Sequence, residues 1–183
     1  MPGPQQHRGY CSLAKRREEP PFVADRRRRV ARRLGGDRTV LLVYGRNEAA
    51  KEKVARFLMQ LGLEPVLLDE QEARGRTLIE KLDQQPPVAS AVVLLTGDDV
   101  GGLASRRRLL RRRARQNVIL ELGFTIGRLG RGRVCALYDE GVELPSDFLG
   151  VEYTPLDEPG AWKAKLAREL YAAGLEFDPL RAL

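Results

Sequence analysis

The feature of this sequence that most constrains its fold is a series of short apolar runs separated by segments of helical periodicity. Continuous apolar runs at 39–44, 90–96 and 133–138 are typical of parallel strands covered on both faces. Shorter runs at 65–69 and 151–154 bring the set to five. Helical patterns over 48–61, 77–84, 117–129 and 162–173 alternate with them. This order predicts an α/β protein of flavodoxin-like type, with a five-stranded, doubly wound parallel sheet and helices on both faces.

Basic residues are concentrated at the N-terminus. The net charge of the 183-residue chain is +7, and residues 1–36 hold ten Lys or Arg against three Asp or Glu, whereas the rest holds 22 of each sign. With four prolines and few apolar residues, this segment is expected to be a disordered basic arm. The folded domain is expected over 37–178, with a short tail over 179–183. The arm is the one part expected to bind nucleic acid. The absence of aromatic residues among its arginines favours a solvated tail.

The cysteines and the single histidine exclude several kinds of site. Cys11 and His7 lie on the arm and Cys135 lies within an expected strand, so we expect neither a disulfide framework, nor a metal site, nor a catalytic system that uses histidine. The chain has no signal peptide and no apolar run of about 18 residues. It is therefore expected to be cytoplasmic and not to bind membranes.

One helix carries polar residues beside its apolar stripe. At about 100° per residue, one side of the segment after Arg115 is apolar and the adjoining side carries an amide and a carboxylate. The apolar side consists of Val118, Leu122, Ile126 and Leu129, and the adjoining side holds Asn117, Glu121 and Arg128. A helix docked by this stripe would hold Asn117 and Glu121 at the rim of a cleft. The pattern alone favours an ordinary solvated glutamate, and the expected cleft favours a functional one.

The carboxyl ends of the strands are where an open α/β sheet binds its ligands. The segments delivered there supply arginines and a helix N-terminus for phosphates, and amide and carboxylate groups for sugar hydroxyls. These candidates are Arg46 and Arg76 for phosphate, and Asn47, Asp98 and Asn117 for hydroxyls. Neither standard phosphate-binding glycine motif is present.

Each candidate has a structural alternative. Arg46 and Asn47 could serve only to cap a helix, and Asp98 could serve only in the turn expected at 97–102. The arginine-dense segment 106–115 is favoured as a solvated face over a phosphate or partner site. Residues 139–147 are expected to form a loop.

Five successive blocks resemble a known family. Residues 43–50, 75–81, 91–102, 114–123 and 145–150 are similar to blocks of the bacterial TIR-like nucleotide-binding family, which is fused to STING and cyclic-nucleotide sensors in anti-phage defence. The resemblance spans roughly residues 38–176, and the Arg115–Gly123 block is highly specific. It implies the flavodoxin-like TIR fold and hydrolysis of NAD⁺ at the nicotinamide–ribose bond, with Glu121 catalytic and Gly45 in the substrate site. NAD⁺ would then be a substrate, with no cofactor.

The residues suit that chemistry. Cleavage of the bond passes through an oxocarbenium-like state that a carboxylate stabilises, and neutral nicotinamide leaves without a general acid. Tyr44 stands where many members of the family have His, and Asn47 where many have Asp. The resemblance further implies self-association on activation and a separate sensor or cyclic-nucleotide system. A non-catalytic nucleotide-binding or protein-interaction module is the alternative.

Overall fold

The computed structural model describes residues 38–67, 87–106, 108–146 and 150–178. The arm at 1–36, the expected helix at 77–84, Arg76 and the tail at 179–183 lie outside these residues.

The centre of the molecule is a five-stranded sheet whose strands are all parallel. Its strands are β1 (Thr39–Val43), β2 (Glu64–Leu67), β3 (Ser90–Leu95), β6 (Val134–Tyr138) and β8 (Glu152–Pro155), in the order β2-β1-β3-β6-β8. All six residues of the central strand β3 are buried, as expected for a parallel strand covered on both faces. The predicted α/β fold and its five-stranded parallel sheet are confirmed.

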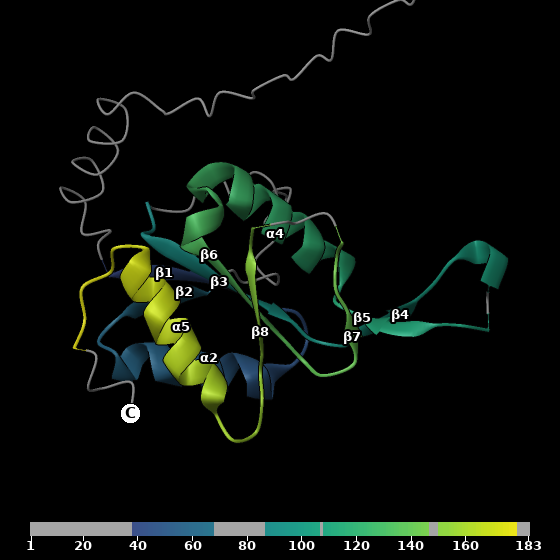
Figure 1. Ribbon diagram of the computed structural model, residues 1–183, viewed down its shortest axis with the longest axis horizontal. Coiled ribbons are helices and arrows are strands. Elements are labelled where there is room, and N and C mark those ends of the chain that lie inside the picture. The colour runs from purple at the N-terminus through teal and green to yellow at the C-terminus, as the bar shows by residue number, and fades with distance from the viewer. Residues whose placement is uncertain (1–37, 68–86, 107, 147–149, 179–183) are drawn as a thin grey trace, which may run out of the picture.

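Helices cover both faces of this sheet (Figure 1). Helices α2 (Glu48–Gln60) and α5 (Ala161–Ala172) pack on one face, where Phe57 meets Trp162 edge to face. Helix α4 (Gln116–Leu129) packs on the other face, against β1, β3 and β6. Within the described parts of the chain, the helices all fall short of the length and apolarity that crossing a membrane requires.

The alternation of side chains along the strands divides the core into two layers. Odd and even residues of a strand point to opposite faces, so each apolar run supplies both layers. In β1, Val40 and Leu42 face α2 and α5, whereas Leu41 and Val43 face α4. The continuous apolar runs in the sequence follow from this double coverage.

A second, smaller sheet lies at one end of the molecule. Strands β4 (Asp99–Gly101) and β5 (Arg111–Arg113) form an antiparallel hairpin, and β5 pairs in parallel with β7 (Val142–Glu143). The hairpin extends away from the main sheet (Figure 1). The expectation of only a turn at 97–102 and only a loop at 139–147 was therefore wrong. These strands have two or three residues and no apolar alternation, and they form because they pair with each other.

Candidate functional site

The strand order reverses between β1 and β3, which are neighbours in the sheet although β2 separates them in the chain. The loops that follow these two strands therefore meet at the carboxyl edge of the sheet, where ligands bind in such folds. Gly45 and Arg46 follow β1, and Thr96 and Asp98 follow β3.

The carboxylate of Asp98 connects the two loops. Its Oδ2 atom accepts a hydrogen bond from the Thr96 hydroxyl at 2.8 Å and another from the backbone N–H of Arg46 at 3.0 Å. A Cβ atom placed on Gly45 would lie 1.9 Å from the same oxygen, so this arrangement requires glycine there. The structure thus brings Gly45, Arg46 and Asp98 together at the point where the strand order reverses. Their role toward a substrate stays a prediction.

Asn47 has a structural task at this edge. Its Oδ1 atom accepts a hydrogen bond from the backbone N–H of Ala50 at 3.0 Å, which is the bond of an N-cap residue. The capping role considered from the sequence is therefore present.

Glu121 lies deeper than the sequence indicated. Only 1% of its surface is exposed, and it belongs to the buried face of α4 together with Val118, Leu122 and Thr125. Ile126 and Leu129, expected in the apolar stripe, are only half-buried. The buried face is thus rotated around the helix toward Glu121, and the expectation that this residue stands beside the stripe was wrong.

The remaining predicted residues are not all placed by the structure. Asn117 is exposed on the first turn of α4, one turn before Glu121. Arg76 lies outside the described residues.

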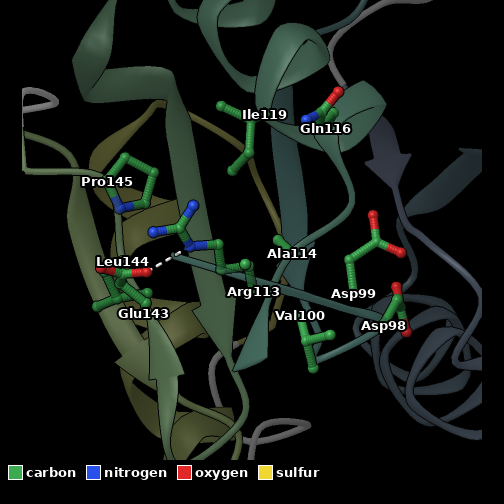
Figure 2. Close-up of a pocket in the computed structure, with 11 residues that line it drawn as sticks. Asp98, Asp99, Val100, Arg113, Ala114, Gln116, Ile119, Glu143, Leu144 and Pro145 are labelled. Atoms are coloured by element: carbon green, nitrogen blue, oxygen red, sulfur yellow. Dashed lines mark hydrogen bonds and ion pairs between the residues drawn. The ribbon is translucent and has the colours of Figure 1, made fainter. Parts of the chain in front are cut away.

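A pocket of about 630 Å³ lies between the small sheet and the start of α4 (Figure 2). Its volume falls in the usual range for small-molecule sites. Its charged lining consists of three carboxylates and one guanidinium, from Asp98, Asp99, Glu143 and Arg113. Among the predicted site residues that the structure describes, Asp98 is the one that lines it.

Arg113 and Glu143 form an ion pair along one wall of this pocket (Figure 2). The Nε atom of Arg113 donates a hydrogen bond to Oε2 of Glu143, its partner in the register of β5 and β7. This hydrogen bond lowers the pKa of the Glu143 carboxyl. Sequence reasoning missed both residues as members of a site. The arginine-dense segment carried no signal that one of its members would pair across a strand.

The pocket and Glu121 lie on different sides of α4. Gln116 and Ile119 line the pocket, and on a helix Glu121 stands about 140° from the first and about 200° from the second. The pocket is therefore a separate feature from the surroundings of Glu121. Asp98 lines the pocket and also accepts a hydrogen bond from the loop after β1.

Over residues 38–67, 87–106, 108–146 and 150–178, no three His, Cys, Asp or Glu side chains come together as metal ligands.

Comparisons with known proteins give a family and two relatives. Residues 39–158 match the family model described as the CAP12/Pycsar effector protein, TIR domain. The chain is 47% identical over 146 residues to the uncharacterized protein YuaY of Escherichia coli K12, covering 80% of this chain and 49% of that protein. It is 32% identical over 128 residues to the protein tirC of Dictyostelium discoideum, covering 63% of this chain and 64% of that one. The chain thus spans about half the length of the first relative and under two thirds of the second.

Proposed function

This chain belongs to the TIR-domain family of CAP12/Pycsar effector proteins, and from that membership we propose that it hydrolyses NAD⁺ and releases nicotinamide. The observation that carries the proposal is the buried carboxylate of Glu121. A glutamate is rarely buried so completely, and buried titratable groups gather at functional sites more often than elsewhere.

In the proposed reaction, the bond between the anomeric carbon of the ribose and the nicotinamide nitrogen breaks. Its electron pair stays on nicotinamide, which leaves as a neutral molecule. The carboxylate of Glu121 stabilises the positive charge that develops on the sugar. Water then adds to the anomeric carbon and loses a proton, which yields ADP-ribose.

The carboxyl edge of the sheet supplies the proposed binding groups. The cluster of Gly45, Arg46 and Asp98 would position the nucleotide beside the start of α4, with Asn117 on the first turn of that helix. Arg76 is proposed for phosphate on sequence grounds. A separate cyclic-nucleotide system, which the effector family implies, and self-association on activation complete the proposal.

The test is the substitution Glu121→Gln in the full chain. We expect the fold to be kept, because the two side chains have nearly the same shape, and NAD⁺ cleavage to fall by about a hundredfold or more. The measurement is release of nicotinamide by chromatography at high protein concentration, with a melting curve of each variant. Glu169→Gln is the matched control, since it makes the same change in α5 on the opposite face of the sheet.

The same measurements distinguish the proposed enzyme from the alternative, a non-catalytic interaction module. An unchanged cleavage rate in Glu121→Gln would remove this residue from the mechanism. Absence of cleavage by the unmodified chain at every concentration would favour a non-catalytic interaction module.

A further inference from the structure

The β4–β5 hairpin exposes an unusual number of large apolar side chains. Val100, Leu103, Leu109 and Leu110 are each between 57 and 68% exposed. They lie on one projecting hairpin (Figure 1), whereas single exposed apolar residues are scattered on most proteins. A cluster of this kind marks an interaction surface.

The part of this hairpin from Leu103 onward carries charge of one sign. Residues 103–115 contain seven arginines and no acidic residue. We define the hairpin tip as Leu103, Arg108, Leu109 and Leu110. The tip is thus apolar and basic, so its partner should offer apolar contacts together with carboxylates.

The pocket at the base of the hairpin has the opposite character. Three carboxylates and one guanidinium line it, and the pairing of Arg113 with Glu143 leaves the carboxylates of Asp98 and Asp99 as its net charge. Ile119, Leu144 and Pro145 supply an apolar wall (Figure 2). A smaller groove of about 220 Å³ shares Gly101, Arg113 and Glu143 with the pocket and extends it toward Leu103 and Leu109.

Within one copy, the tip points away from the pocket. The pocket is lined by the base of the hairpin, and the tip extends away from that base (Figure 1). Each copy therefore carries a surface and a site that complements it, which is what head-to-tail association of identical chains requires.

We propose that the hairpin tip of one copy docks into the pocket of a second copy, with Leu109 and Leu110 against the apolar wall and Arg108 beside Asp99. This contact deepens the self-association in the proposed function and rests on it, but it is measured without NAD⁺.

The first experiment tests the tip. The full chain is examined by sedimentation velocity over a wide range of concentrations, with and without the double substitution L109D/L110D. Both side chains are exposed, so the fold should be kept, and the dissociation constant for self-association should rise by about tenfold or more. Met59→Asp is the matched control, because Met59 is similarly exposed but lies on α2, and its self-association should equal that of the unmodified chain.

The second experiment tests the pairing by exchange of charge. Asp99→Lys alters the pocket, and Arg108→Glu alters the tip. Each variant alone should associate more weakly. A mixture of the two should associate again, since each tip then meets a pocket of opposite charge. Circular dichroism checks that each variant is folded, and L109D/L110D still decides the proposal should Asp99→Lys fail this check.

Three outcomes overturn the proposal. The first is unchanged self-association of L109D/L110D, and the second is failure of the charge-exchanged mixture to associate when both variants are folded. The third is the finding that the tip binds vesicles containing anionic lipid and that self-association does not depend on the tip. If self-association depends on the tip but NAD⁺ is never cleaved, the docking surface stands and the proposed enzyme activity fails.

Discussion

Because Gly45 has no side chain, the carboxylate of Asp98 can approach the loop after β1 and hold the two loops at the carboxyl edge of the sheet together. Alanine at this position would place Cβ 1.9 Å from Oδ2 of Asp98, so the carboxylate would have to leave its hydrogen bonds to Thr96 and Arg46. We expect Gly45→Ala to lower the free energy of unfolding by about 1–3 kcal/mol. It should also weaken any binding of nucleotide at this edge.

Gly127→Ala is the control for that substitution. Gly127 lies in α4, no atom lies within 4 Å of an added Cβ, and the exchange should raise stability by roughly 0.5–1 kcal/mol. Urea unfolding of the two variants should therefore shift in opposite directions. Equal stability of Gly45→Ala and the unmodified chain would mean that Asp98 moves aside without loss.

Cys135 should be chemically silent in the folded protein. Burial raises the pKa of its thiol from 9.0 to about 12, so the reactive thiolate is scarce at pH 8. In a chain carrying Cys11→Ser, we expect an aromatic disulfide reagent to label Cys135 only after denaturant is added. Rapid labelling of the folded chain would contradict the prediction.

The same raised pKa makes stability depend on alkaline pH. The folded chain keeps the thiol proton at a pH at which the unfolded chain releases it. The contribution of this group is therefore complete below about pH 9 and is lost as the pH rises toward about 12.

Among the helices and strands, the N-cap of α2 is a position where substitutions can distinguish a structural role of Asn47 from a functional one. Asn47 bonds the N–H of Ala50, so Asn47→Ala should lower stability by about 1 kcal/mol. Asp caps helices as well as Asn does, so Asn47→Asp should melt like the unmodified chain. A changed Michaelis constant for NAD⁺ in Asn47→Asp, with an unchanged melting temperature, would show that this position also contacts the substrate. Unchanged values of both would leave it as a cap alone.

Helix α4 shows why the depth of a residue is hard to predict from one helix. The apolar pattern of α4 predicts its buried side to within about 100° around the helix axis, the turn of one residue. That pattern consists of Val118, Leu122, Ile126 and Leu129. The face that is buried depends on which strands the helix crosses, and these are β1, β3 and β6. This packing turned Glu121 inward.

At the scale of the whole molecule, activity should depend on protein concentration. If the proposed site is completed by association, the active fraction follows the population of the associated state. NAD⁺ turnover per molecule should then rise across a dilution series and saturate once association is complete. The L109D/L110D variant should reach the same turnover only at higher concentration. A flat line at substantial activity would indicate a site that is complete in the monomer.

Local patterns in the sequence are enough to predict the architecture of the main sheet. Five apolar runs, with helices between them and glycines near the helix ends, are local patterns, and each specifies its element with little help from the rest of the chain. The same local information placed Gly45, Arg46 and Asp98 at one edge, because the carboxyl ends of parallel strands must meet there.

The remaining features depend on how distant segments of the chain pack together. Strands β4, β5 and β7 have no apolar alternation. Strands β4 and β5 pair across a hairpin, and β5 also pairs with β7, about 30 residues further along the chain, which no local pattern encodes. The ion pair of Arg113 with Glu143 and the acidic pocket beside it follow from that pairing. The burial of Glu121 was decided in the same way, because a helix pattern gives a direction around the axis, whereas burial requires the surface on which the helix lies.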